Sequence, residues 1–225
     1  MLFGLLIRAF QHRENRGVIM VIDNVKVYGL EESIKRAKYP MSTDINKLTS
    51  ELTKGIKSLA NSKKGEGHDQ WLTGVIVQFD LTFTVKAFVE AERYHFLDFV
   101  SSQSTMHRIT KFNLDEAYIE YVDPRIVEIM KEKVAEYNAL GSYDMVDVKL
   151  HMDLDELKKQ KYLEILYSNP CGFKLTAGMT TNYRQLKTIY HQRKMHRLPE
   201  WREFCAEIEK LPMFKELCLG GENNE

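Results

Sequence analysis

The segment from residue 173 to residue 208 constrains the fold more than any other part of the sequence. It opens with FKLTAGM at residues 173–179, whose apolar and β-branched content favours a strand. After Thr180 and Thr181 comes the basic run NYRQLKTIYHQRKMHR, with apolar residues at helical spacing. Pro199 interrupts this helix or starts a new one, because it lacks a backbone N–H. The following helix has Trp201, Phe204 and Ile208 on its apolar side. The sequence therefore predicts a strand that leads directly into two helices.

One stripe of the basic helix combines polar and apolar side chains. Asn182 and Arg193 fall on nearly the same helical face, roughly 16 Å apart along the axis, and Leu186 and Ile189 lie between them. A guanidinium offers an anion a planar fork of donors, so the stripe is suited to an extended anionic ligand. This interpretation predicts that Arg193→Ala weakens ligand binding and leaves the fold intact. The alternative is a basic amphipathic helix whose polar side lies in water.

The order of residues in this stretch resembles the C-terminal signature of the flavin-dependent thymidylate synthases. That signature is N-x-R, an arginine nine residues later, and then a helix rich in aromatic and acidic residues. The matching residues here are Asn182, Arg184 and Arg193. The resemblance implies that Asn182 and Arg184 contact flavin and that Arg193 helps to hold deoxyuridine monophosphate.

A second segment, which starts at Gly67, is similar to the same family. The family has a histidine with aromatics, a phenylalanine-rich strand, a helix, and an R-H-R-x-x-S motif that leads to a second serine. Phe79 and Asp80 fit the strand, His95 falls on the histidine of the triplet, and Ser104 falls on the final serine. The two motifs therefore occur in the family's order.

Several motif positions differ from the family pattern. They are Tyr94 and Phe96 in place of the two arginines, Phe99 in place of the first serine, Ser102 in place of an acid, and Met106 in place of an arginine. Arg93 and Arg108 lie one and two positions from these losses, so they are candidates to replace the missing cations.

The resemblance implies a set of roles for the site. The implied catalytic residues are Arg193 and Ser104; the implied cofactor-binding residues are His95, Asn182, Arg184 and Arg197; and the implied substrate-binding residues are Arg93, Gln103, Ser104, Arg108 and Arg193. In this family reduced flavin supplies a hydride and methylenetetrahydrofolate supplies the carbon of the new methyl group. The expected cofactor is FAD, with NADPH and methylenetetrahydrofolate as co-substrates and a pyrimidine deoxynucleotide as substrate. The family also assembles homotetramers with active sites between subunits, and we expect the same here.

Local patterns complete the expected architecture. We expect strands at residues 25–28, 72–84 and 173–179, and helices at 31–38, from Ser42 to about 59, at 85–96, from Asp123-Pro124 onward, and at 154–167. Helices around a few strands, without regular βαβ alternation, indicate an α+β fold: a helix-rich subunit around a small, mostly antiparallel sheet. We expect one domain at residues 20–219, an N-terminal extension at 1–19, and a disordered tail at 220–225.

Composition excludes several classes of function. The 32 basic and 32 acidic residues balance, which removes the general attraction expected of a protein that binds polymeric nucleic acid. The three cysteines are widely spaced and indicate reduced thiols in the cytoplasm. No apolar run is long enough to span a membrane. No Walker loop, G-x-S-x-G or zinc motif occurs, and His68 with Asp69 reads as solvated surface, so we expect no metal site.

Three hypotheses remain open from the sequence. The first is a divergent flavin-dependent synthase that performs reductive one-carbon transfer to a pyrimidine nucleotide. The second is a flavin-free nucleotide-binding or regulatory protein that has kept the fold and lost the activity. The third is a structural or interaction protein whose motif residues only support the core. Flavin binding separates the first from the second, and nucleotide binding separates both from the third. Separately, the cluster of Ser101, Ser102 and Ser104 is read either as a polar turn or as a source of a serine nucleophile, which would need an activating base nearby.

Overall fold

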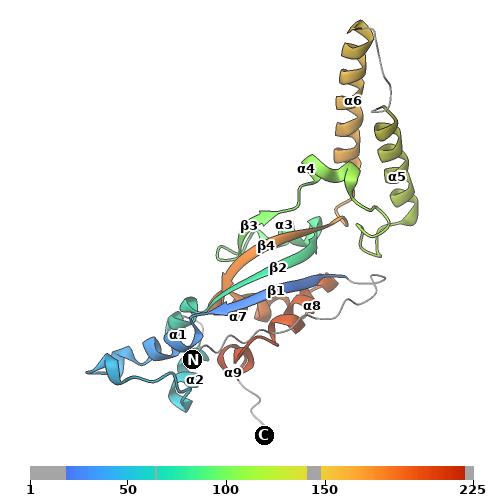
Figure 1. The fold of residues 1–225 in the computed structure, drawn as a ribbon. Helices are drawn as coiled ribbons and strands as arrows, with labels where there is room; N and C mark the ends of the chain where they lie inside the picture. The colour runs from blue at the N-terminus through green and yellow to red at the C-terminus, as the bar shows by residue number, and fades with distance from the viewer. Residues whose placement is uncertain (1–18, 64, 141–147, 221–225) are drawn as a thin grey trace.

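A four-stranded antiparallel sheet lies at the centre of the molecule (Figure 1). The structure is a computed structural model that describes residues 19–63, 65–140 and 148–220. The strands lie in the order β1 (Val21–Tyr28), β2 (Ile76–Thr84), β4 (Lys174–Asn182) and β3 (Asp98–Ser102). Each neighbouring pair is antiparallel. The predicted α+β fold with a small antiparallel sheet is confirmed.

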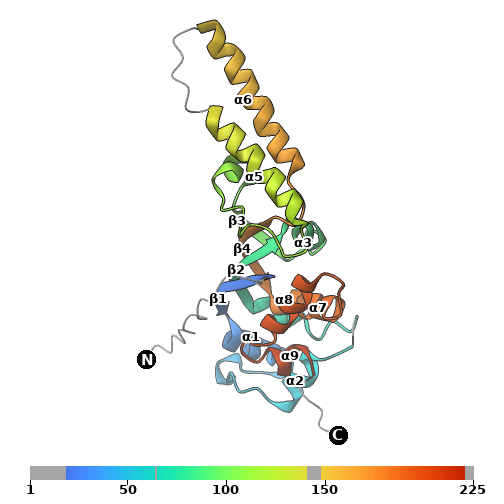
Figure 2. The same ribbon diagram turned by 90° about the vertical axis from the view of Figure 1, so that its right-hand side faces the viewer.

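One face of the sheet forms the main hydrophobic core. Strand β2 alternates, with Val77, Phe79, Leu81 and Phe83 buried on this face. Helices α7 (Tyr183–Arg193) and α8 (Pro199–Ile208) lie on one side of the sheet and pack against these residues (Figure 2). The predicted restart at Pro199 is confirmed, because Pro199 occupies the first turn of α8.

The remaining helices surround the two ends of the sheet. They are α1 (Leu30–Ala37), α2 (Lys54–Ala60), α3 (Val85–Ala91), α4 (Thr105–Arg108), α5 (Pro124–Ala139), α6 (Val148–Ser168) and α9 (Phe214–Cys218). Helices α5 and α6 form a hairpin that projects away from the sheet (Figures 1 and 2). At its base a second hydrophobic cluster includes Ile109, Met130, Ile165 and Phe173. Asp123 caps α5 by accepting a hydrogen bond from the Arg125 amide at 2.9 Å, as the Asp-Pro pair predicts.

The prediction of a long helix that starts at Ser42 is wrong. The structure has a 3₁₀ turn at Ile45–Lys47 and then extended backbone before α2. The ammonium of Lys38 takes the backbone carbonyls of Thr49 and Glu51, at 2.7 and 2.8 Å, and holds this segment in its non-helical path. Spacing of apolar residues could not reveal this capture, because Lys38 precedes the segment in sequence.

Other expected elements have different bounds, and β2 and α3 differ in ways that matter for the core. The strand predicted at 72–84 begins only at Ile76, after a 3₁₀ segment at Gln70–Gly74. The helix predicted at 85–96 ends at Ala91, and Tyr94 then turns into the core with 6% of its surface exposed. Ser101 and Ser102 belong to edge strand β3 instead of a polar turn. Every residue of β3 is exposed, so it shows no alternation by which the sequence could have predicted it.

The predicted terminal segments lie almost entirely outside the described residues. Only residues 19 and 220 of the expected extension and tail are described, and Met20 is buried in the main core. Among the helices that the structure describes, none combines the length and hydropathy that crossing a bilayer requires.

Candidate functional site

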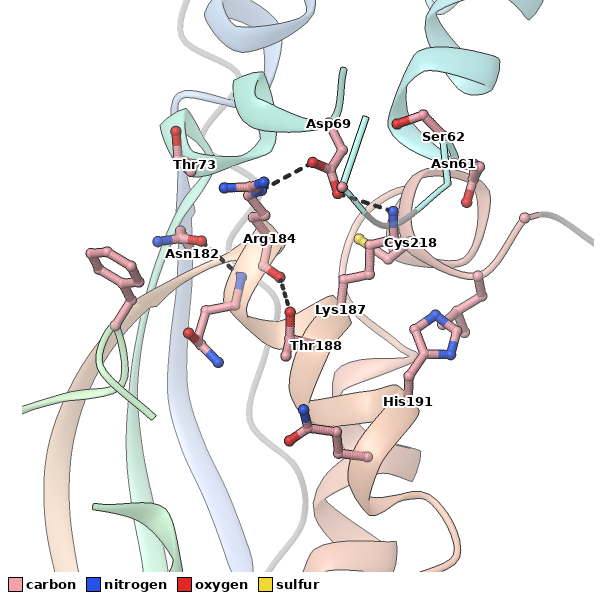
Figure 3. A pocket seen from close by; sticks show the side chains of 16 residues that line it. Asn61, Ser62, Asp69, Thr73, Asn182, Arg184, Lys187, Thr188, His191 and Cys218 are labelled. Atoms are coloured by element: carbon pink, nitrogen blue, oxygen red, sulfur yellow. Dashed lines mark hydrogen bonds and ion pairs between the residues drawn. The ribbon is translucent and has the colours of Figure 1, made fainter. Parts of the chain in front are cut away.

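A pocket of about 640 Å³ opens beside α7, at the point where β4 runs into this helix (Figure 3). Its wall comes from the first three turns of α7, the segments that follow α2 and α9, and the residues just before β2 and β3. The residues that line it include Asp69, Phe96, Asn182, Arg184, Lys187 and Gln192. Segments distant in sequence therefore meet at the start of the basic helix.

Asn182 lies at the last position of β4 and caps α7. Its side-chain oxygen accepts a hydrogen bond from the Gln185 amide at 2.9 Å, which satisfies one of the free donors at the helix start. The side-chain nitrogen has no hydrogen-bond partner among residues 19–63, 65–140 and 148–220. Because Asn182 is only 8% exposed, the cap holds its amide donor at the pocket wall.

Arg184 and Lys187 share one carboxylate, that of Asp69. Arg184 Nε lies 3.0 Å from Asp69 Oδ1, and Lys187 Nζ lies 3.3 Å from Asp69 Oδ2 (Figure 3). Arg184 Nη1 also donates to Gln70 Oε1 at 2.7 Å, and Lys187 Nζ donates to the Ala60 carbonyl at 2.7 Å. Two cations against one anion leave this part of the pocket with a net positive charge, which favours an anionic or acceptor-rich ligand.

The other titratable groups of the pocket are neutral near pH 7. Partial desolvation lowers the pKa of His191 below its ordinary value of 6.5. Burial raises the pKa of the Cys218 thiol, which lies 3.8 Å from the Tyr183 carbonyl as a weak donor. Cys218 is therefore a protonated, packed thiol, which excludes it as a thiolate nucleophile.

Arg193 lies inside the molecule, away from the pocket. It is 3% exposed, and its guanidinium donates to the Tyr94 hydroxyl at 2.6 Å and to Glu90 Oε2 at 2.8 Å. It also stacks against Trp201, with Cζ 4.9 Å from the ring centroid. The predicted stripe from Asn182 to Arg193 does occupy one helical face, but that face packs into the core. The expectation that the whole stripe faces a ligand is corrected for this reason.

His196 completes the cluster around Arg193. Its Nδ1 accepts a hydrogen bond from the Leu198 amide at 3.2 Å, and its Nε2 lies 2.6 Å from Arg193 Nη1 and 3.5 Å from Glu90 Oε2. Burial and the Arg193 charge lower the pKa of His196. The Arg193 hydrogen bond lowers the pKa of Glu90 below its ordinary value of 4.5. The cluster is thus an ion pair of Arg193 and Glu90 beside a neutral imidazole.

The other predicted site residues lie on the exterior in two groups. Arg93, His95 and Arg197 are exposed, and the His95 ring packs edge-on against Phe96 at 4.9 Å. Gln103, Ser104 and Arg108 follow β3. Gln103 lines a second hollow of about 480 Å³ and extends the pairing with β4, since its side-chain oxygen accepts from the Thr176 amide at 2.9 Å. The structure therefore brings Asn182 and Arg184 into one pocket and leaves the other predicted residues outside it.

Several pocket residues had no role predicted from the sequence, among them Lys187, Thr188 and Gln192. Asp69 was expected to be solvated surface, but its side chain is 18% exposed and holds two cations. The described part of the chain contains no group of three or more histidine, cysteine or carboxylate side chains placed to hold a metal ion. The position of Lys187, one turn after Arg184, was the available signal for the shared acid.

Solved structures provide the decisive comparison. The flavin-dependent thymidylate synthase ThyX from Helicobacter pylori, in a crystal structure complexed with FAD and dUMP, superposes with a TM-score of 0.59 and 14% sequence identity, and the alignment covers 87% of this chain and 95% of that chain. The fold is that of the flavin-dependent thymidylate synthases. A second structure of the same Helicobacter pylori enzyme, with FAD and dUMP at 2.31 Å resolution, gives a TM-score of 0.60 at 14% identity over 88% of this chain and 95% of that chain.

The flavin-dependent thymidylate synthase fold is the extent of what this similarity shows. No protein-family model matches the chain, and a comparison with curated protein sequences gives no match. A proposal for the activity therefore rests on the residues of the pocket.

Proposed function

We propose that this chain is a divergent flavin-dependent thymidylate synthase-like enzyme that transfers a one-carbon unit reductively to a nucleotide of the deoxyuridine monophosphate type. One observation carries the proposal. Asn182 and Arg184, which match the family's flavin-contacting residues, line the same pocket on the matching fold.

The donors of the pocket fit the chemistry of FAD. A flavin dinucleotide presents ring carbonyls and phosphates, which are acceptors, and the pocket offers the Asn182 amide and the Arg184 and Lys187 cations. Phe96 adds an aromatic surface to the same wall. We propose that Asn182 and Arg184 hold FAD, with His95 and Arg197 at the exposed edge. When bound and reduced, the flavin supplies the hydride, and NADPH and methylenetetrahydrofolate are the proposed co-substrates.

We assign the nucleotide to the segment that follows β3. Gln103, Ser104 and Arg108 are close in sequence there, and Arg93 lies just before β3, so these residues are the proposed contacts for sugar and phosphate. Ser104 keeps its proposed catalytic role by resemblance. For Arg193, the interior contacts favour a positioning role, because its guanidinium already donates to Tyr94 and Glu90.

We further propose that the protein self-associates as a homotetramer. Phe99 and Val100 on edge strand β3 are 45% and 68% exposed, and Met106 in α4 is 59% exposed. Exposed apolar residues on an unpaired strand edge are typical of an interface between subunits. Sedimentation equilibrium is expected to give a mass close to four times the 26.4 kDa chain. A single-chain mass at micromolar concentration would overturn this part of the proposal.

Flavin binding tests the proposed function directly. The purified protein is incubated with FAD and desalted, and retained visible absorbance is expected. Arg184→Ala is expected to weaken FAD binding about 10- to 100-fold, because a charge-assisted hydrogen bond contributes about 1.5 to 3 kcal/mol. Arg125→Ala is the control, since it removes a guanidinium from the exposed start of α5, outside the pocket.

Three results have distinct meanings. Tight binding by wild type and weak binding by Arg184→Ala support the proposal. Equal binding by both proteins removes Arg184 from the site. A colourless protein that still binds deoxyuridine monophosphate in calorimetry contradicts the flavin enzyme and favours the flavin-free nucleotide-binding protein.

A further inference from the structure

A chain of hydrogen bonds connects the buried Arg193 to the pocket. Arg193 Nε lies 2.6 Å from the Tyr94 hydroxyl oxygen, and this oxygen lies 3.0 Å from Gln192 Oε1. Arginine can only donate, so the Tyr94 oxygen accepts from Arg193 and its own hydrogen is left to donate. Gln192 lines the pocket. The Arg193–Tyr94 pair therefore determines which end of the Gln192 amide faces Tyr94.

The orientation of Gln192 follows from this donor and acceptor count. Because Tyr94 donates, the amide oxygen of Gln192 faces it, and the amide nitrogen is the other end. That nitrogen has no hydrogen-bond partner in the described part of the chain. Asn182 has the same arrangement at the start of α7: its side-chain oxygen accepts from the Gln185 amide, and its side-chain nitrogen has no hydrogen-bond partner among the described residues. Two amide donors, each with its oxygen fixed by the protein, thus line one pocket.

The part of the pocket at the start of α7 is cationic, and the part near the end of α7 is uncharged. Arg184 and Lys187 lie in the first turns, whereas Gln192 is about 12 Å further along the axis than Arg184. Partial desolvation lowers the pKa of the exposed His191, its neighbour, below the ordinary value of 6.5. A phosphate is suited to the cationic first turns, and a neutral amide donor suits an uncharged carbonyl oxygen. The pocket therefore matches a ligand with a phosphate at one end and a ring carbonyl at the other.

We propose that Gln192 is a ligand-binding residue whose amide nitrogen donates to a ring carbonyl of a pyrimidine-dione, and that Tyr94 and Arg193 are positioning residues that hold this amide. The inference rests on the proposed function for the identity of the ligand. The flavin ring of FAD carries this dione and is the expected ligand. The uracil of deoxyuridine monophosphate carries it too, but the sugar and phosphate of that nucleotide are assigned to the segment after β3, outside this pocket. Tyr94 and Gln192 thereby gain a joint role in specificity, since the Tyr94 O–H favours the amide orientation that presents the Gln192 nitrogen to the ligand.

Three variants test the inference by isothermal titration with FAD alone, deoxyuridine monophosphate alone, and both together. Gln192→Leu removes the amide donor and is expected to weaken the binding of the dione-containing ligand about 10-fold. In Gln192→Glu, one carboxylate oxygen accepts from Tyr94 and the other faces the ligand carbonyl, so two acceptors meet. At pH 8 the affinity of this variant for the ligand is expected to be at least 10-fold below that of wild type. It is expected to recover as the pH approaches about 4.3, where the carboxyl gains a proton and can donate. Tyr94→Phe frees the amide to rotate and is expected to weaken binding 3- to 10-fold.

The controls separate this inference from the proposed function. Gln160→Leu on α6 lies outside the pocket and is expected to bind as wild type does. Thermal melts of each variant show whether an effect comes from lost folding, and the pH-dependent recovery of Gln192→Glu, absent in wild type, cannot come from packing alone. Wild type that binds neither ligand overturns the proposed function together with this inference. If wild type binds a ligand and both Gln192→Leu and Gln192→Glu bind it with the same affinity as wild type, the inference about Gln192 is overturned and the proposed function is not. The ligand whose affinity changes identifies the source of the dione.

Discussion

Arg193→Ala is expected to lower the free energy of unfolding by about 3 to 5 kcal/mol, the cost of breaking a buried ion pair from one side. The side chain is 4% exposed, and Glu90, 24% exposed, would lose the guanidinium at 2.8 Å. The Tyr94 hydroxyl would lose its donor, and Trp201 would lose its cation contact. Urea denaturation measures the effect. Arg36→Ala in α1 is the matched control, because Arg36 is exposed and its removal is expected to change stability by less than about 0.5 kcal/mol.

The pH dependence of this loss identifies its cause. The folded-state pKa of Glu90 is lowered, so the carboxylate contributes stability that is present above its ordinary value of 4.5 and is lost as the pH falls through the folded pKa. The stability difference between wild type and Arg193→Ala is therefore expected to be full at pH 7 and to shrink below pH 4.5. An Arg193→Ala protein with unchanged stability and lost nucleotide affinity would contradict the interior role and restore the ligand contact predicted from the sequence.

Trp201→Ala is expected to lower the free energy of unfolding by about 3 to 5 kcal/mol, the range for emptying a large aromatic site in a core. Trp201 is fully buried, and its ring centroid lies 5.0 Å from Phe83, 5.6 Å from Phe204 and 5.8 Å from Tyr94. It joins α8 to the sheet and forms one wall around Arg193. The change would therefore open a cavity and loosen the ion pair together.

Denaturation of Trp201→Ala is compared with Tyr167→Ala at the end of α6. Tyr167 is 88% exposed, and its removal is expected to change stability by less than about 0.5 kcal/mol. A loss below about 1 kcal/mol for Trp201→Ala would show that the cluster around α8 is not the main core.

Most of the helices and strands predicted from periodicity occur in the fold. The strand before Asn182, the basic helix, the restart at Pro199 and the helix after Asp123 all occur, because each has a local signal in its cap, its proline or its apolar spacing. The helix expected from Ser42 failed because Lys38, outside the segment, takes two of its carbonyls. Strand β3 was missed because it is an exposed edge.

The site was predictable only in part. Asn182 and Arg184, to which the resemblance assigns flavin contacts, both line the pocket. Local geometry places them there: a helix cap and the first turn after it. Asp69 was not predicted, because its partners follow it by more than a hundred residues and meet it only through folding. Gln192 had no motif of its own.

By itself, the sequence determined the α+β class, the strand that enters the basic helix, and the single helical face shared by Asn182, Leu186, Ile189 and Arg193. Those are properties of neighbours along the chain, and spacing records them. The tertiary structure alone decided that this face packs inward. Tyr94, 99 positions from Arg193, supplies the acceptor that holds the guanidinium in the core and directs the Gln192 amide. Spacing defines which residues share a face, but only packing of distant segments determines whether that face meets the core or a ligand.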